Sequence, residues 1–283
     1  MSEQIRDWEW EIKSESSWSG VSVKELYAYK DLLFRLVRKE FLASFQQTIL
    51  GPFWVIFQPL LTVLTYVLVF GKVIGLSTEG FPSFLYYLIG ITLWNLFSEI
   101  FLNTSYTFSQ NIGIFSKVYF PRLIAPLSLL LLYLLRFSIQ FFFLLTVYSY
   151  FCFTGASEFN LFRFLLVIPV ITITAGIGFG AGLIFSILST KYKDLLGLLQ
   201  LTTRLLMFVC PIFYSLTIVP EKLLRFVYLN PLSSLFESFR YSFLGKGQIE
   251  ILPLLYSLAA MILLVLGGVL LFNKMGDKLM DVA

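Results

Sequence analysis

Residues 162–188 read FRFLLVIPVITITAGIGFGAGLIFSIL, with Arg163 as the one charged side chain. A helix needs about 20 apolar residues to cross the hydrocarbon core of a bilayer, and this run exceeds that length. Because lipid offers no hydrogen-bond partners to the backbone, such a run is expected to be helical. Its two overlapping small-xxx-small pairs predict the close approach of neighbouring helices and no chemistry. The pairs consist of Gly176, Gly178, Gly180 and Gly182.

The composition of the whole chain agrees with this run. Of the 283 residues, 58% are hydrophobic and 13% are charged, whereas water-soluble domains are about half apolar and a quarter charged. The balance predicts an all-α, polytopic integral membrane protein. The chain has no histidine, which excludes histidine-based acid–base catalysis, histidine-activated nucleophiles and histidine-ligated metals. The two cysteines, Cys152 and Cys210, lie in apolar runs and are expected to act as small core residues.

Between the fifth and sixth of the expected spans lies an apolar stretch, 216–250, that is unlike a plain loop. Asn230-Pro231 divides it, because the residue before a proline disfavours helix. Its halves, 221–229 and 232–244, are too short to cross the membrane and are predicted to be two external re-entrant half-helices. The six expected transmembrane helices lie near 52–74, 84–102, 121–153, 162–188, 195–215 and 251–272.

Six spans place both termini on one side, and the basic residues indicate which side. Of the 21 Lys and Arg, 13 fall in segments on the side of the termini, six in the opposite segments and two within spans. The positive-inside rule therefore predicts cytoplasmic N- and C-termini. The first 22 residues lack a signal-peptide core, so the first span is expected to direct insertion. The expected division is a polar tail over 1–22, an interfacial helix over 23–45 and a transmembrane domain over 46–283.

The clearest amphipathic helix is predicted over residues 23–41. At about 100° per residue, one face is apolar and the opposite face is charged. A basic helix directly before a cytoplasmic membrane entry is expected to lie among the headgroups of the inner leaflet. Packing on a soluble partner is the alternative, and the two are compatible. The apolar face carries Leu26, Tyr29, Leu33, Leu36 and Val37, and the charged face carries Lys24, Asp31, Arg35, Arg38 and Lys39.

The first span carries aromatic and polar residues at i, i+4 spacing. Such a stripe points into protein or water rather than lipid. It indicates either a substrate path, in which rings stack on the C–H faces of sugars and polar groups bond hydroxyls, or packing between helices through Gln and Thr. The stripe consists of Trp54, Gln58, Thr62, Tyr66 and Phe70.

Two arginines, Arg136 and Arg204, interrupt apolar runs at apparent membrane depth. A charge at that depth usually faces a cavity or a partner. Because the guanidinium fork suits phosphate oxygens, both arginines are candidates for a path that carries an anionic, phosphate-bearing substrate. Snorkelling from the end of a helix is the alternative interpretation.

Two cytoplasmic connections, 104–121 and 191–194, are either solvated links or docking elements for a partner ATPase. The first is expected to form a short helix and a turn with a basic exit. This chain is not expected to bind ATP through a P-loop itself, because neither Gly71-Lys72 nor Gly245-Lys246 has the remaining residues of that motif.

From about Leu26 to Phe272, the chain resembles the membrane subunit of bacterial ATP-binding-cassette exporters of polysaccharides. That family handles O-antigen, capsule and teichoic-acid chains. The chain departs from the family pattern at Arg136 and Arg204, where an acidic and an amide residue are expected. The matching segments, in order, are QTILGPFW at 47–54, QPL at 58–60, VFG at 69–71, SKVYFPR at 116–122, KYKD at 191–194, Pro211 with Tyr214, NPL at 230–232, Glu237 and Arg240.

The resemblance implies a homodimer of six-helix exporter subunits in contact with membrane lipids. Two copies of a separate ATPase bind ATP and Mg, and lipid-linked polysaccharide is the substrate; no cofactor, metal, catalytic residue or nucleic acid is implied for this chain. The interfacial helix is the implied gate, through Leu26, Tyr29, Leu33, Arg35, Arg38 and Lys39. The implied ATPase-coupling residues are Lys117, Tyr119, Arg122, Lys191, Lys193 and Asp194, and Asn230, Pro231, Glu237 and Arg240 mark half-helices over the pore exit.

Two other functions fit parts of the sequence. One is an exporter of drugs or lipids with the same architecture. The segments 50–54 and 117–122 argue against it, because they resemble the polysaccharide exporters. The other is a membrane-embedded glycan transferase. Such an enzyme needs histidine or paired carboxylates facing a cavity, and Glu99 is the one acidic residue well inside a span.

Overall fold

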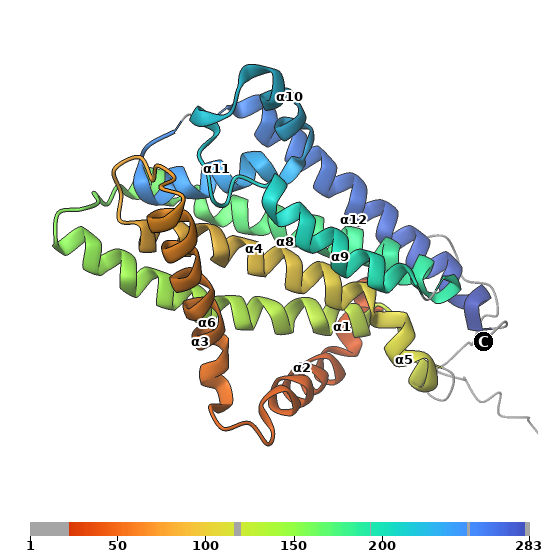
Figure 1. Ribbon diagram of the computed structural model, residues 1–283. Helices are drawn as coiled ribbons and strands as arrows, with labels where there is room; N and C mark the ends of the chain where they lie inside the picture. The colour runs from red at the N-terminus through yellow and green to blue at the C-terminus, as the bar shows by residue number, and fades with distance from the viewer. Residues whose placement is uncertain (1–22, 116–119, 193, 248–249, 281–283) are drawn as a thin grey trace, which may run out of the picture.

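The computed structural model describes residues 23–115, 120–192, 194–247 and 250–280, and in these ranges its regular structure is entirely helical (Figure 1). Three short turns are η1 (Gly51–Phe53), the π-helical η2 (Val67–Val73) and η3 (Leu216–Ile218). The α-helices are α1 (Val23–Ala28), α2 (Lys30–Phe45), α3 (Trp54–Tyr66), α4 (Ser83–Ser105), α5 (Thr107–Phe115), α6 (Ile124–Phe153), α7 (Leu161–Phe164), α8 (Val167–Lys191), α9 (Leu195–Val209), α10 (Glu221–Leu229), α11 (Pro231–Leu244) and α12 (Ile251–Met280).

Five helical segments in the described part of the chain are long and apolar enough to cross a membrane. They agree with five of the six expected spans. The fifth expected span, 195–215, corresponds to α9, which ends at Val209 after 15 residues. At 1.5 Å per residue its length is about 22 Å, shorter than a hydrocarbon core of about 30 Å. The five segments are Gly51–Val73, Ser83–Ser105, Ile124–Phe153, Leu161–Lys191 and Ile251–Lys274.

Proline positions explain where the shorter helices begin and end. Cys210 precedes Pro211 and has an extended backbone, with φ −72° and ψ 143°, so α9 stops there. Asn230 is also extended, and its side-chain oxygen accepts a hydrogen bond from the Leu232 amide at 3.1 Å. Pro231 occupies the first position of α11, where its missing N–H costs nothing. The predicted break at Asn230-Pro231 is therefore confirmed.

The centre of the fold is a layer in which α8 packs between α4 and α12, with α6 on the other side of α4. The glycines of α8 bring these helices together. A Cβ atom at Gly180 would lie 2.5 Å from the backbone of Leu264 in α12, and one at Gly182 would lie 2.6 Å from the Cβ of Thr104 in α4. The predicted close packing is confirmed, because each glycine pair serves one neighbouring helix.

The long helices run side by side, and their two ends carry different elements (Figure 1). The helices α2 and α5 and the end of α12 gather at one end, whereas α10 and α11 lie at the other. Helix α11 packs against α4, α8 and α12. The α3 segment crosses the others obliquely, and only 17% of its most apolar window is buried.

The helix expected over residues 23–45 is present as two pieces. Helices α1 and α2 meet at Tyr29, whose carbonyl still accepts a hydrogen bond from the Leu33 amide at 3.1 Å. Helix α2 lies along α6, with Val37 and Phe41 against the core. The helical prediction over 23–45 is therefore confirmed apart from the one-residue break; the tail over 1–22 lies outside the described residues.

Candidate functional site

A cavity of about 560 Å³ opens between α4 and α9 beside the upper part of α3. Helix α4 presents residues at i, i+4 spacing, and α9 presents one stripe at i, i+3, i+4 spacing, so both helices turn a single face toward it. The cavity therefore combines rings, hydroxyls, an amide and a guanidinium. Its lining consists of Tyr66, Trp94, Ser98, Leu102, Gln200, Thr203, Arg204, Met207 and Phe208.

Aromatic rings pack against Tyr66 and Phe208, which line this α4–α9 cavity. The ring of Phe213 lies 4.8 Å from that of Tyr66, nearly perpendicular to it, and 4.5 Å from that of Phe70. Phe208 packs on Phe213 at 5.6 Å. The Tyr66 hydroxyl donates to the sulfur of Met207 at 3.7 Å. Ring faces of this kind match the C–H faces of sugars.

The structure brings only the C-terminal half of the predicted α3 stripe to the cavity. Tyr66 lines it, and Phe70 packs behind Tyr66. Thr62 donates its hydroxyl to the Gln58 carbonyl at 2.9 Å, and Gln58 itself is exposed. Trp54 is 40% exposed on the α3 surface. The packed face of α3 is instead the adjacent row Val55, Pro59 and Val63.

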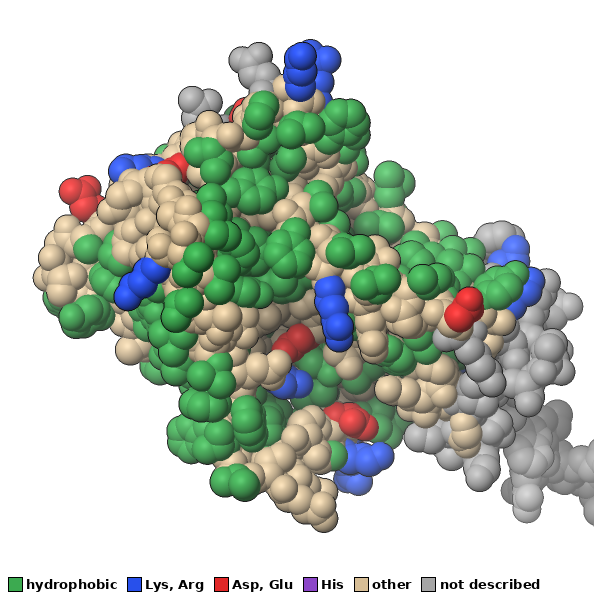
Figure 2. Space-filling view, in the orientation of Figure 1, with side chains coloured by type: hydrophobic (Ala, Val, Ile, Leu, Met, Phe, Trp, Pro, Cys, Tyr) green, Lys and Arg blue, Asp and Glu red, His purple; other side chains and the backbone are tan. Residues whose placement is uncertain are grey.

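Arg204 lines the α4–α9 cavity, as the path interpretation predicts. Its side chain is exposed, and in the described part of the chain it forms no ion pair. Next to it on α9, the Gln200 amide donates to the Tyr106 hydroxyl. Figure 2 shows charged side chains in the hollow between the α2–α3 arm and the layer above it. Because Arg204 is exposed and lines the α4–α9 cavity, its charge is accessible to a ligand there.

Arg136 has a different environment, between α4, α6 and α2. Its Nε lies 4.0 Å from the Oε2 of Glu99, and its guanidinium lies 5.5 Å from the ring centre of Tyr133 and 5.9 Å from that of Phe45. One turn further along, Asn95 donates to Gln140 at 3.2 Å. Sequence reasoning missed this polar ladder. Its signal was the i, i+4 spacing of Asn95 with Glu99 and of Arg136 with Gln140.

A second buried arginine organises the opposite end of the fold. Arg240 is 1% exposed, and its Nη1 lies 3.1 Å from the Oε2 of Glu237. Its guanidinium also donates to carbonyls of the segment after α9 and lies 4.3 Å from the ring centre of Tyr86. The sequence indicated Glu237 and Arg240 but not these partners. The carbonyls belong to Pro211, Ile212 and Tyr214.

This arrangement of helices coincides with a known family. The ABC-2 type transporter family matches residues 31–244, from α2 to the end of α11. The chain belongs to the ABC-2 type transporter family. The family indicated by the sequence resemblance is therefore confirmed, and the chain is a multi-pass membrane protein of the ABC-2 class.

Relatives of this ABC-2 transporter cover nearly its whole length. An O-antigen export system permease protein, RfbA, of Klebsiella pneumoniae is 29% identical over 254 residues, which are 89% of this chain and 95% of the relative. The RfbA permease protein of Myxococcus xanthus is 25% identical over 258 residues, 90% of this chain and 96% of the relative. The similarity thus includes both the α4–α9 cavity and the Arg240 cluster.

Three of the six predicted ATPase-coupling residues of the ABC-2 transporter, Arg122, Lys191 and Asp194, belong to the described part of the chain. Arg122 precedes α6 and is half-buried, and Asp194 precedes α9. Lys191 ends α8, and its Nζ lies 5.3 Å from the ring centre of Tyr192. Lys117, Tyr119 and Lys193 lie outside the described residues. Their coupling role stays a prediction.

The predicted gate residues of the ABC-2 transporter separate as the amphipathic pattern requires. Arg35, Arg38 and Lys39 are exposed, whereas the apolar residues are half-buried. Helix α2 therefore keeps its charged face free while its apolar face meets α6. The half-buried residues are Leu26, Tyr29, Leu33, Leu36 and Val37.

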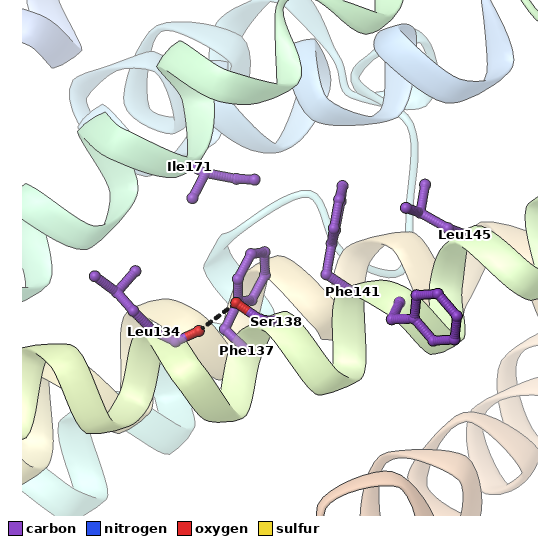
Figure 3. A pocket seen from close by; sticks show the side chains of 7 residues that line it. Leu134, Phe137, Ser138, Phe141, Leu145 and Ile171 are labelled. Carbon is purple, nitrogen blue, oxygen red and sulfur yellow. Dashed lines mark hydrogen bonds between the residues drawn. The ribbon is translucent and has the colours of Figure 1, made fainter. Parts of the chain in front are cut away.

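A second cavity, of about 360 Å³, lies between α6 and α8 (Figure 3). Its lining is aliphatic and aromatic except for Ser138, whose hydroxyl donates to the Leu134 carbonyl at 2.9 Å. Side chains such as Phe141 and Ile171 face each other across it. This cavity offers little to orient a sugar, because Ser138 is its one polar side chain, whereas the α4–α9 cavity also has an amide and a guanidinium.

Proposed function

We propose that this chain is the permease subunit of an ATP-driven exporter that moves lipid-linked polysaccharide of the O-antigen class across the bacterial inner membrane. The observation that carries the proposal is its similarity, over about nine-tenths of its length, to relatives named O-antigen export permeases. The α4–α9 cavity supports it, because rings beside hydroxyl and amide groups suit a chain of sugars.

The working assembly in this proposal is a homodimer with two copies of a separate ATPase that binds ATP and Mg. Both termini lie in the cytoplasm, in agreement with the excess of basic residues on that side. Helix α9 and the buried turn after it form the sixth crossing, and α10 and α11 form the external re-entrant pair. The family assignment and the clustering of α2, α5 and the α8–α9 link at one end support this arrangement.

A membrane-embedded glycan transferase fits the structure less well. Glu99 was its one candidate acid or base well inside a span, and this carboxylate pairs with Arg136. Such an enzyme needs histidine or paired carboxylates, and the partner of Glu99 is a guanidinium instead. Export of drugs or lipids by the same architecture is the remaining alternative, and the names of the relatives favour polysaccharide.

The proposed function is tested by deleting the gene in its native bacterium. We expect surface polysaccharide to disappear and lipid-linked polysaccharide to accumulate in the cytoplasm, with both restored by the wild-type chain. Affinity capture of the tagged chain should retain an ATP-binding-cassette ATPase. Normal surface polysaccharide with altered drug or lipid efflux would establish the alternative exporter instead.

The interfacial gate makes a separate prediction. Each basic residue near an anionic leaflet contributes about 1 kcal/mol, so changing Arg35, Arg38 and Lys39 together to Glu should lift α2 from the headgroups. Lipid-linked polysaccharide should then accumulate while the partner ATPase is still captured. The control is Lys222→Glu with Arg225→Glu on α10, exposed at the opposite end. If the triple variant exports normally, α2 is only an anchor.

A further inference from the structure

Arg204 lies well inside the apolar helix α9, away from the polar end of that helix. Helix α9 begins at Leu195, directly after the polar residues Lys191 and Asp194. Nine residues further along, at 1.5 Å each, Arg204 is about 13 Å from that polar end. A cation at this depth is expensive in lipid, so it faces a cavity or a partner. The structure places it on the wall of the α4–α9 cavity.

Two other arginines of the described chain, one in α6 and one in α11, pair with protein carboxylates. Arg136 pairs with Glu99, and Arg240 pairs with Glu237. Within the described residues no carboxylate pairs with Arg204, and its side chain is exposed. Its charge is therefore available to an anion from outside the chain, whereas the other two charges are already neutralised.

The surroundings of Arg204 suit a sugar better than a bare ion. Trp94 and Tyr66 supply aromatic rings, Ser98 supplies a hydroxyl from α4, and Gln200 supplies an amide from α9. The cavity volume of about 560 Å³ falls in the range of about 300–1,000 Å³ typical of small-molecule sites. Rings that stack on a sugar and a guanidinium fork that pairs with its carboxylate form a complete set for an acidic sugar.

We propose that Arg204 recognises a carboxylate carried by the sugars of the transported glycan. The α4–α9 cavity then selects acidic over neutral polysaccharide. This inference rests on the proposed function, because it names the substrate class of the same path. Arginine is required rather than lysine, since only the planar fork makes two parallel hydrogen bonds to one carboxylate.

The test uses the purified full-length chain in lipid nanodiscs, with fluorescence anisotropy of two labelled oligosaccharides of equal length. The probes are tetragalacturonate and maltotetraose. We expect the wild type to bind tetragalacturonate about tenfold more tightly, as for one charge-assisted pair. Arg204→Gln should bring the two affinities within about twofold, and Arg204→Lys should keep part of the preference. Arg225→Gln, exposed on α10 outside the cavity, is the matched control and should keep the full preference.

Equal binding of both probes by the wild type, binding of neither, or an unchanged preference in Arg204→Gln overturns the inference. A competition arm with inorganic pyrophosphate separates the sources of the anion. If pyrophosphate competes in an Arg204-dependent way and the wild type does not prefer tetragalacturonate, Arg204 binds the phosphate linkage of the lipid carrier. That result also overturns the inference. The proposed function is tested separately, by the loss of surface polysaccharide in the deletion strain. If the chain exports polysaccharide but the purified protein shows no preference for the acidic probe, only the inference about Arg204 is wrong.

Discussion

Gly180→Ala is expected to destabilise the protein by about 3 kcal/mol, the upper end for overpacking a well-packed core. The added Cβ would lie 2.5 Å from the backbone carbon of Leu264 and 2.5 Å from the amide nitrogen of Val265. Backbone atoms cannot rotate away as a side chain can. The contact is also tight from the α12 side, because a Cβ at Gly268 would lie 2.7 Å from the Gly180 carbonyl oxygen. Helices α8 and α12 must therefore separate along their contact.

The measurement is unfolding by SDS titration in detergent micelles, followed by circular dichroism. Gly267→Ala is the matched control, one residue from Gly268 on the same helix, where nothing lies within 4 Å of an added Cβ. It should be neutral or slightly stabilising, since alanine is the better helix former by about 1 kcal/mol. Equal unfolding midpoints for the two variants would mean that the α8–α12 contact is looser than the structure indicates.

The helix positions could be predicted from the sequence because length and apolarity decide them. The runs that became α4, α8 and α12 need no partner to be recognised, and the glycine spacing of α8 predicted its close neighbours. Asn230-Pro231 predicted the break before α11 for a local reason, the restricted backbone before proline. The end of α9 has the same cause at Pro211, and reading that proline as a stop would have shortened the predicted span.

The direction in which a helix face points could not be predicted in the same way. Helix α4 is buried along most of its length, and the i, i+4 spacing of Asn95 with Glu99 does not show which neighbouring helix that face meets. Arg136 and Arg204 therefore received one interpretation, although the structure gives them different surroundings. The i, i+4 stripe of α3 was likewise continuous in sequence, but only Tyr66 lines the cavity. Which neighbour a helix face meets depends on tertiary contacts, which the sequence pattern of that helix does not contain.

Arg240→Met is expected to destabilise the protein by about 3–5 kcal/mol, as when one partner of a buried ion pair is removed. The 1%-exposed guanidinium is bonded to Glu237 and to the carbonyls of the segment after α9. Methionine leaves the Glu237 charge and these carbonyls without a donor. The same segment carries Phe213, whose ring packs on Tyr66. Loss of Arg240 should therefore loosen the packing on Tyr66, which lines the α4–α9 cavity, and export should fall together with stability.

A double variant separates the buried charge from the lost carbonyl contacts. Glu237→Leu with Arg240→Met removes both charges, so it should recover part of the stability lost in Arg240→Met, since paired apolar replacement of a buried ion pair is often neutral. Recovery should stay incomplete because the carbonyls of the segment after α9 remain unbonded, at about 1–3 kcal/mol for a buried unsatisfied group. Arg225→Met, on the exposed surface of α10, should change stability by less than about 0.5 kcal/mol. If Arg240→Met unfolds at the same SDS concentration as Arg225→Met, Arg240 does not hold α11 to the end of α9.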